Sequence, residues 1–294
     1  MNLLNETKFI MNKYNITASK SLGQNFLIDE EIVDGIVENA EVSSEDLIIE
    51  IGPGLGTLTS KLLEKAGRVI CIELDKRMVK IITERFSLYK NFEVIYDDVL
   101  KVDLKNLISE NLQNYNLKNA KVVANLPYYI TTPIIMKLLE ERLNLTSITV
   151  MVQKEVAIRL AQTPGKKESG AITYGIYYYT EPEIVLNVPR TSFIPSPEVD
   201  SAVIKLSILK EPRVKVANEK LFFEIIKLSF MQKRKTLVNG LSNGSIFSSK
   251  QEVINMLEKL GFDTQIRGEK LSIEDFAKIA DYVEKLKKTK ESGD

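Results

Sequence analysis

The sequence predicts an α/β protein whose open, mainly parallel β-sheet is followed by a small all-helical domain. Two patterns predict this arrangement. Between residues 47 and 155, short apolar runs alternate with amphipathic stretches of about ten residues, which is the pattern of βαβ units with helices on both faces of a sheet. After Leu209 only helical patterns follow. We therefore predict two domains, residues 1–209 and residues 210–294.

The apolar runs give the strands in order. Strands of the parallel sheet are expected at LIIEIG (47–52), RVICIEL (68–74), FEVIYDD (92–98), KVVAN (121–125) and SITVMVQ (147–153). Two later runs, IVLNVPR (184–190) and VDSAVIKLSIL (199–209), are interpreted as an antiparallel pair at one edge. Such short runs bounded by turn residues are typical of buried strands.

The amphipathic stretches give the helices. In the first domain they cover residues 58–66, 76–86, 104–112 and 133–143. In the second they cover residues 219–241, 249–262 and 272–288, and the last residues form a polar tail. Apolar positions spaced three and four apart place one face of each helix against a core.

Composition narrows the possible chemistry. The 294-residue chain has no histidine, one cysteine and a formal net charge of zero. Histidine-dependent nucleophilic catalysis and histidine-ligated metals are therefore excluded, and we expect no metal. The lone Cys71 lies in an apolar run and is interpreted as a core residue. Because no apolar run reaches 18 residues and no secretory leader is visible, we expect a cytoplasmic protein without a membrane span.

Polar groups follow four consecutive predicted strands. Glu50 precedes the loop Gly52–Gly56, Glu73 closes the second strand, Asp97 and Asp98 close the third, and Asn125 closes the fourth. In a parallel sheet, ligands bind beyond the carboxyl ends of the strands. A glycine loop lets the backbone approach a ligand closely, and an acid at the next strand end accepts the ribose hydroxyls of a nucleoside. The sequence therefore predicts a nucleoside-containing cofactor, with either Asp97 or Asp98 on its adenine.

The stretch NLPY, residues 125–128, decides between a nicotinamide dinucleotide and S-adenosylmethionine. No second phosphate-binding motif and no obvious residue pair for hydride transfer is present. An exocyclic amine of adenine is a poor nucleophile, because its lone pair is delocalised into the ring. Oxygens of Asn125 and of the neighbouring backbone could accept hydrogen bonds from that amine, Pro127 would fix the chain direction, and Tyr128 would stack on the base. These groups favour methyl transfer from S-adenosylmethionine.

The sequence resembles the ribosomal RNA adenine N6-dimethyltransferases, and most of all their bacterial small-subunit type. The matching motifs cover nearly the whole chain in family order: SLGQNFLID (21–29), IEIGPGLGTLT (49–59), IELD (72–75), NLPYYITTPI (125–134), MVQKEVAIRL (151–160), FIPSPEVDSAVIKL (193–206) and RKTLVNGL (234–241). The resemblance implies a Rossmann-like class I S-adenosylmethionine-dependent fold, with a helical C-terminal domain that binds rRNA or the ribosomal subunit.

The resemblance also implies roles for individual residues. The cofactor would be contacted by Asn25, Leu27, Gly52, Glu73, Asp98 and Asn125. Catalysis would depend on Asn125, Leu126, Pro127, Tyr128 and Phe193, with Tyr128 and Phe193 enclosing a flipped adenine. The implied reaction is dimethylation of two adjacent adenosines in a hairpin loop near the 3′ end of small-subunit rRNA, late in assembly of the 30S particle.

Positive charge gathers in one segment. Residues 205–240 hold nine bases and three acids, a net of about +6, whereas residues 29–50 hold nine acids and no base. We expect Lys233, Arg234 and Lys235, helped by Lys13 and Lys20, to contact rRNA phosphates. We also expect a monomer. Two alternatives are a large-subunit rRNA methylase of the antibiotic-resistance type and a ribosome-assembly factor without catalysis.

Overall fold

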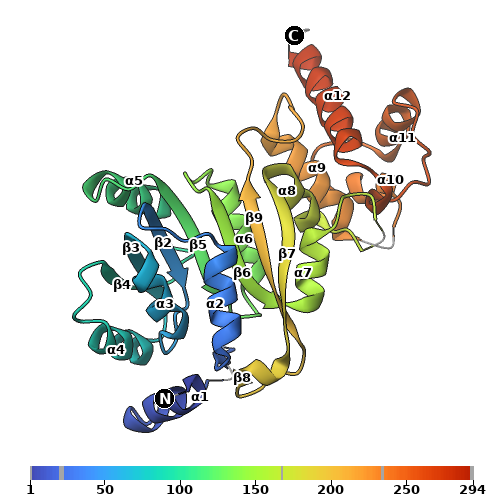
Figure 1. The fold of residues 1–294 in the computed structure, drawn as a ribbon. Helices are drawn as coiled ribbons and strands as arrows, with labels where there is room; N and C mark the ends of the chain where they lie inside the picture. The colour runs from blue at the N-terminus through green and yellow to red at the C-terminus, as the bar shows by residue number, and fades with distance from the viewer. Residues whose placement is uncertain (1, 20–22, 167, 233–234, 292–294) are drawn as a thin grey trace. The chain divides into compact units, whose positions relative to one another are not determined.

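The computed structural model describes residues 2–19, 23–166, 168–232 and 235–291. The chain forms two compact units (Figure 1), one of Met1–Ile158 with Glu181–Ile208 and one of Arg159–Thr180 with Leu209–Asp294. The second unit therefore includes a segment of the middle of the chain, which the sequence analysis assigns to the first domain. Aromatic packing explains this, because Tyr178 lies with its ring centroid 5.3 Å from that of Phe222.

The first unit is built on a seven-stranded sheet of order β4-β3-β2-β5-β6-β9-β7. The strands are β2 (Asp46–Ile51), β3 (Arg68–Glu73), β4 (Phe92–Tyr96), β5 (Asn119–Asn125), β6 (Ser147–Gln153), β7 (Thr180–Val188) and β9 (Ser201–Ile208). Strands β2 to β6 pair in parallel, and β9 runs antiparallel to β6. The predicted α/β fold class is confirmed, with the two later strands at one edge.

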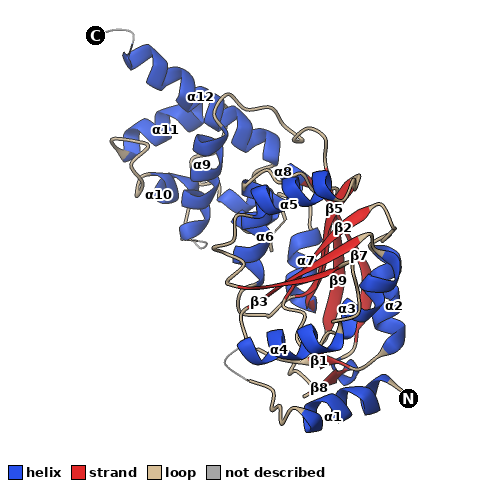
Figure 2. Cartoon of the chain, turned by 90° about the vertical axis from the view of Figure 1, so that its left-hand side faces the viewer, coloured by secondary structure: helices blue, strands red, loops and turns tan. Residues whose placement is uncertain are grey.

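Helices cover both faces of this sheet, with α2 and α3 on one side and α5 and α6 on the other (Figure 2). Their bounds are α2 (Glu30–Asn39), α3 (Thr57–Lys65), α4 (Lys76–Arg85), α5 (Leu104–Asn114) and α6 (Thr131–Glu140), and α7 (Lys154–Ala161) follows β6. Asp29, Asp75 and Asp103 begin α2, α4 and α5 by accepting hydrogen bonds from backbone N–H groups of the first turn. Each aspartate thus ends a loop and begins a helix at the carboxyl edge of the sheet, where the candidate site lies.

The N-terminal segment adds elements that the sequence analysis does not predict. Helix α1 (Leu3–Lys13) packs Ile10 against Leu55, Met78 and Ile81, which belong to the glycine loop and α4. The short strand β1 (Phe26–Leu27) pairs with β8 (Phe193–Ile194), next to the 3₁₀ turn η2 (Arg190–Ser192). Two family motifs more than 160 residues apart are thereby joined beside the sheet.

The second unit is helical. It contains α8 (Ala171–Tyr179), α9 (Glu219–Met231), α10 (Leu237–Leu241), α11 (Lys250–Lys259), the 3₁₀ turn η3 (Gly268–Lys270) and α12 (Ile273–Glu291). Its core is aromatic, since Tyr174 contacts Phe276 at a centroid distance of 5.0 Å and Phe230 at 5.4 Å. The Tyr174 hydroxyl donates to the carbonyl of Leu271 at 2.6 Å.

The prediction of a single helix over residues 219–241 is wrong, because this segment forms two helices. Helix α9 ends at Met231, and Thr236 begins α10 by accepting from the N–H of Asn239 at 3.4 Å. The break lets α10 fold back on α9, where a Cβ at Gly240 would lie 3.1 Å from the carbonyl of Leu228. Helix α9 therefore ends before the described basic residue Lys235. Within the described ranges, no helix is long and apolar enough to cross a membrane.

Candidate active site

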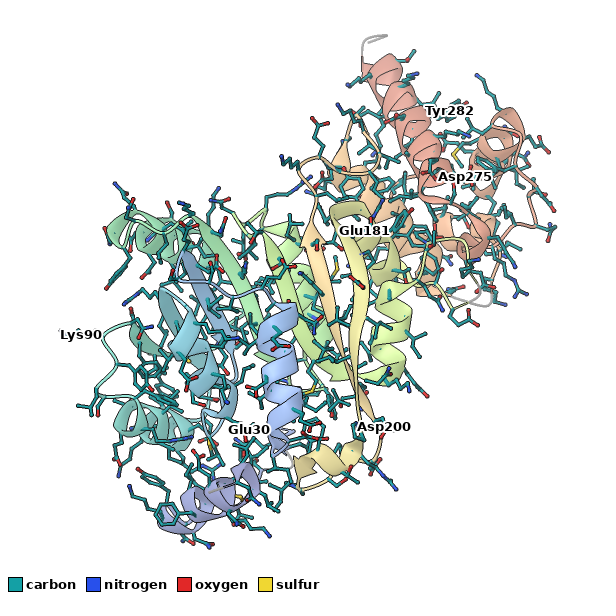
Figure 3. All side chains as sticks on the ribbon, viewed as in Figure 1. Glu30, Lys90, Glu181, Asp200, Asp275 and Tyr282 are labelled. Atoms are coloured by element: carbon teal, nitrogen blue, oxygen red, sulfur yellow. The ribbon has the colours of Figure 1, made fainter. Side chains whose placement is uncertain are left out.

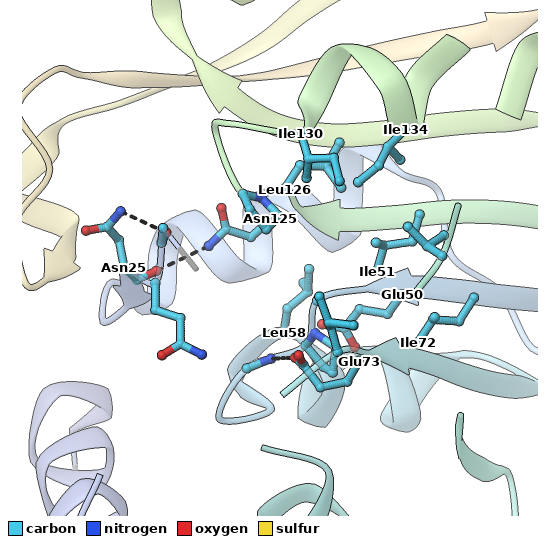
Figure 4. Close-up of a pocket in the computed structure, with 18 of the residues that line it drawn as sticks. Asn25, Glu50, Ile51, Leu58, Ile72, Glu73, Asn125, Leu126, Ile130 and Ile134 are labelled. Atoms are coloured by element: carbon cyan, nitrogen blue, oxygen red, sulfur yellow. Dashed lines mark hydrogen bonds between the residues drawn. The ribbon is translucent and has the colours of Figure 1, made fainter. Parts of the chain in front are cut away.

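A cavity opens at the carboxyl ends of β2, β3 and β5 in the first unit (Figure 4). Its lining comes from residues 23–27 and from the strand ends and the loops that follow them. Nine of the predicted site residues line it: Asn25, Leu27, Gly52, Glu73, Asp98, Asn125, Leu126, Pro127 and Tyr128. The structure thus brings together groups that the sequence places on separate strands.

The loop after β2 lines the cavity, and its backbone adopts a left-handed conformation that favours glycine. Gly52, Gly54 and Gly56 have φ of +68°, +57° and +83°, a region that other residues rarely adopt. The Gly52 N–H donates to the carbonyl of Ile72 at 2.9 Å and fixes the loop to β3. A Cβ at Gly56 would lie 2.5 Å from the ring of Phe86, so this glycine also lets α3 begin close to α4.

Glu73 ends β3 as a buried carboxylate. Its two oxygens accept from the backbone N–H of Asp75 at 2.7 Å and of Gly54 at 3.3 Å. Burial raises the pKa of Glu73 above its usual value, and these backbone hydrogen bonds oppose the rise. The carboxylate is therefore held beside the glycine loop, where a ligand hydroxyl can reach it.

The third strand end supplies two aspartates in different roles. Asp97 is exposed, and its side chain accepts from the N–H of Asp98 at 2.7 Å. Asp98 is half-buried and accepts from the N–H of Leu100 through one oxygen at 3.0 Å. Among the described residues, none donates a hydrogen bond to the other Asp98 oxygen. Beside it Val99 is buried, so this corner offers an acceptor next to an apolar surface.

At the cavity wall, Glu50 belongs to a buried polar cluster. It accepts from the Thr59 hydroxyl at 2.6 Å and from the Cys71 thiol at 3.5 Å. Burial raises the pKa of Glu50 to about 7, despite the opposing bond from Thr59. The cysteine is a buried core residue, and burial raises the pKa of its thiol well above the usual value.

Asn125 presents its amide to the cavity in one orientation. Its nitrogen donates to the carbonyl of Asn25 at 3.5 Å, and Asn25 in turn donates to the carbonyl of Gly23 at 3.3 Å (Figure 4). Within the described part of the chain, no group donates to Oδ1 of Asn125, so this oxygen is available to a ligand. The next residue, Leu126, fixes the chain by donating its N–H to the carbonyl of Met151 at 3.2 Å.

The two aromatic residues expected to enclose a base differ in accessibility. Tyr128 is half-buried at the cavity wall, and its hydroxyl lies 2.7 Å from that of Ser201. Phe193 is 4% exposed, does not line the cavity and packs in a core cluster with Leu27 and Val203. A role for Phe193 in stacking stays a prediction, and it requires this ring to become accessible when a base enters.

Three residues at the cavity are not among the site residues predicted from the sequence. Gln24 links the N-terminal loop to α4 by donating to Asp75 at 3.1 Å. Leu74 and Tyr129 line the cavity with 51% and 57% of their surface exposed. Their positions directly after Glu73 and Tyr128 are the signal that could have identified them.

The predicted RNA-contacting residues are only partly visible. Lys233 and Arg234, like Lys20, lie outside the described residues, whereas Lys235 and Lys13 are exposed. Among the residues that the structure describes, no group of three or more acids or cysteines is arranged to hold a metal ion.

The cavity lining suits a cationic nucleoside better than a dinucleotide. Four carboxyl groups line it (Glu50, Glu73, Asp97 and Asp98), and no described lining residue is lysine or arginine. Such a surface repels a pyrophosphate and attracts a sulfonium. The residues therefore fit S-adenosylmethionine. Fold and site together define an S-adenosylmethionine-dependent methyltransferase.

Comparisons with known proteins identify the family. The family model "Ribosomal RNA adenine dimethylase" matches residues 15–285. The chain is 48% identical, over 93% of its own length and 94% of the relative, to ribosomal RNA small subunit methyltransferase A of Alkaliphilus metalliredigens. The chain therefore belongs to the ribosomal RNA adenine dimethylase family, whose methyl donor is S-adenosylmethionine.

Solved structures agree with this assignment. The fold is similar to that of a dimethyladenosine transferase from Plasmodium falciparum, with a TM-score of 0.70, 28% identity and coverage of 86% of this chain and 95% of the other. It is also similar to the 23S rRNA methyltransferase ErmE, with a TM-score of 0.64, 25% identity and coverage of 88% and 100%. The resemblance seen in the sequence is thereby confirmed.

Proposed function

We propose that this protein dimethylates the N6 amines of two adjacent adenosines in the hairpin loop near the 3′ end of small-subunit rRNA, using S-adenosylmethionine. The observation that carries the proposal is the Asn125 amide, whose nitrogen is held by Asn25 at 3.5 Å while its oxygen stays available at the cavity. High identity over nearly the full length to a protein named ribosomal RNA small subunit methyltransferase A supports the choice of rRNA.

The chain activates the amine by hydrogen bonding. Oδ1 of Asn125 and the carbonyl of Leu126 each accept an N–H of the target amine, which draws its lone pair out of conjugation with the ring. The Leu126 carbonyl is fixed because the N–H of the same residue donates to Met151 at 3.2 Å. Positioned acceptors of this kind act by preorganisation.

No catalytic base is needed. Bound S-adenosylmethionine supplies a methyl group that its sulfonium already activates. Glu73 holds the ribose, Asp98 accepts from the adenine amine, and the backbone of Gly52 lies close to the ligand. The N–C bond would form as the C–S bond breaks, leaving the neutral thioether S-adenosylhomocysteine, and the extra proton of the methylated amine would pass to water. The absence of histidine from this chain is therefore no obstacle.

The target base must leave its stack to reach the cavity. The ring of Tyr128 offers a face for it, and base–aromatic stacking is worth roughly 1–3 kcal/mol. Pro127 holds this part of the wall, because its carbonyl accepts from the N–H of Ile130 at 3.2 Å and from the Thr131 hydroxyl at 3.1 Å. After the first transfer one N–H remains, so one acceptor still orients the monomethylated amine.

The macromolecular partner is the assembling 30S particle in the cytoplasm, and the protein acts as a monomer without a metal or a membrane. Because the net charge of the chain is zero, attraction to RNA must come from local basic surface. The exposed Lys235 and the neighbouring Lys233 and Arg234 supply positive charge in the second unit.

The alternative substrate is large-subunit rRNA, because the structurally similar ErmE is a 23S rRNA methyltransferase. The longer and closer match to the small-subunit relative favours the small subunit. An assembly factor without catalysis is disfavoured, because Glu73, Asp98 and Asn125 all line one cavity.

Radiolabelled methyl transfer tests the proposal. The substrates are small subunits lacking the modification, fully modified small subunits and protein-free large-subunit rRNA. We expect label only in unmodified small subunits, as dimethyladenosine with about four methyl groups per particle, since each of two amines takes two. Label in large-subunit rRNA would support the resistance class, and bound particles without label would support an assembly factor.

A further inference from the structure

We infer that Ser201 is a positioning residue, which fixes the ring of Tyr128 in the orientation that receives the target base. The inference rests on the proposed function, in which Tyr128 is the stacking surface. Ser201 begins β9, whereas Tyr128 follows β5, and β6 lies between these strands in the sheet. The contact therefore ties the catalytic loop to a strand that is not its neighbour.

The geometry of the contact is well defined. The hydroxyl oxygens of Tyr128 and Ser201 are 2.7 Å apart, and Ser201 is 0% exposed. A tyrosine ring joined to the backbone at one end and hydrogen-bonded at the other keeps the direction of its long axis. Only rotation about that axis remains, and packing at the cavity wall limits it. The hydrogen bond thus favours one rotamer of the Tyr128 side chain over the others that this half-buried ring could adopt.

The position of Ser201 is fixed by its partner in the sheet and by the contacts of the preceding residue. It pairs with Gln153 in the antiparallel β6–β9 ladder. The preceding Asp200 accepts from the N–H of Lys154 at 3.0 Å through its carbonyl and from the N–H of Arg190 at 3.0 Å through its side chain. Figure 3 shows Asp200 at the end of the sheet where Glu30 begins α2, which is the end that carries the site. The anchor is therefore part of the rigid sheet.

The remainder of the loop does not depend on Ser201. Its backbone is fixed by the N–H of Leu126 on Met151 and by the contacts of the Pro127 carbonyl with Ile130 and Thr131. Removal of the Ser201 hydroxyl should consequently release the Tyr128 ring while leaving the cofactor side of the cavity intact. Burial raises the pKa of Tyr128 while the bond to Ser201 opposes the rise, so the phenol stays neutral at working pH.

A double-mutant cycle tests the inference with three variants: Ser201→Ala, Tyr128→Phe and the combination. Each removes the same hydrogen bond, so each should lower kcat/KM for unmodified small subunits by about tenfold or less, and the double variant by no more than either single one. The dissociation constant for S-adenosylmethionine should stay within about twofold. Ser207→Ala, an exposed serine on the same strand, is the matched control and should leave all values unchanged.

Wild-type activity on these particles separates the two proposals. If wild-type protein labels none of them, the proposed function fails. If it labels them while Ser201→Ala keeps normal kcat/KM, or the two losses multiply, or cofactor binding is lost as well, the positioning role of Ser201 is overturned. Should Ser201→Ala not fold, Tyr128→Phe still decides, because full activity without the phenol hydroxyl contradicts the role.

Discussion

At the residue scale, few side chains form the site, and the proposed mechanism gives each a different role. Asn125, Glu73 and Glu50 all line the cavity, and Glu50 and Glu73 are buried. In the proposed mechanism Asn125 accepts from the target amine and Glu73 holds the cofactor. Substitutions at these three positions should therefore change three different properties, which are methyl transfer, cofactor affinity and the pH dependence of stability.

Asn125→Ala should abolish methyl transfer while cofactor affinity changes by less than about tenfold, roughly 1.4 kcal/mol. The reason is that its oxygen accepts from the target amine, whereas the cofactor has several other contacts. Single-turnover transfer and equilibrium binding of S-adenosylmethionine measure the two effects. Asn114→Ala, exposed on α5, serves as control. Near-normal turnover of Asn125→Ala would refute the mechanism.

Glu73→Ala should weaken cofactor binding by about 10- to 100-fold, because a charged acceptor for the ribose hydroxyls is lost from a buried position. Calorimetric titration with S-adenosylmethionine measures the change. Glu64→Ala removes an exposed carboxylate from α3 and should have no effect. Unchanged affinity in Glu73→Ala would place the ribose elsewhere.

Glu50 should make the protein less stable as pH rises. Its pKa is raised from 4.5 to about 7 in the folded protein, so the folded state binds more protons than the unfolded state between these values. The free energy of unfolding then falls from about pH 4.5 to pH 7, by roughly 3 kcal/mol from this group. Urea denaturation of wild type and Glu50→Gln at pH 5 and pH 8 measures it.

Glu50→Gln stays neutral at every pH and can still accept from the Thr59 hydroxyl. The variant should therefore lose stability less between pH 5 and pH 8 than wild type does. An identical pH dependence in both proteins would show that Glu50 is not the titrating group.

At the element scale, the start of α3 depends on the absence of a side chain at Gly56. A Cβ there would lie 2.5 Å from the ring of Phe86 and 3.2 Å from Ile82 of α4, at a φ of +83°. Gly56→Ala should cost about 2–4 kcal/mol of stability, because backbone strain and overpacking add. Gly261→Ala has a similar φ of +79° with nothing within 4 Å, so it should show the strain alone.

Denaturant midpoints of the two alanine variants measure the difference. We expect Gly56→Ala to be the less stable, and to bind the cofactor more weakly, because the displaced loop lines the cavity. Equal losses in the two variants would mean that α3 can move away from α4 without cost.

At the scale of the whole molecule, a chain of zero net charge must bind RNA through a local surface. Substituting Lys233, Arg234 and Lys235 by glutamine should weaken binding to small subunits. It should also reduce the slope of log affinity against log salt by about 2, because about 0.7–0.9 of a counterion is released per phosphate contact. Filter binding at several salt concentrations measures the slope.

The matched control removes three exposed lysines of the same unit, Lys278, Lys285 and Lys287, and so lowers the net charge equally. If both triple variants change the slope alike, the effect is one of overall charge. If neither changes it, the basic segment is only a solvated surface.

Elements with local signals could be predicted before the structure was known. Alternating strand and helix patterns predicted the parallel sheet, and polar residues at successive strand ends predicted Glu73, Asp98 and Asn125 in one place. These predictions worked because parallel strands bring their carboxyl ends to a single edge, so chain order alone fixes the neighbourhood. The NLPY stretch indicated the chemistry because its groups are consecutive.

Features that depend on contacts between distant residues became visible only in the three-dimensional structure. The break after Met231 arises because α10 packs on α9, and residues 159–180 join the second unit through their aromatic side chains. The pairing of β1 with β8 joins residues 166 and 168 positions apart, Leu27 with Phe193 and Phe26 with Ile194. The bond between Tyr128 and Ser201 joins residues 73 positions apart. Contacts of this kind leave no periodic signal in the sequence, because their stability comes from packing between elements and not from local propensity.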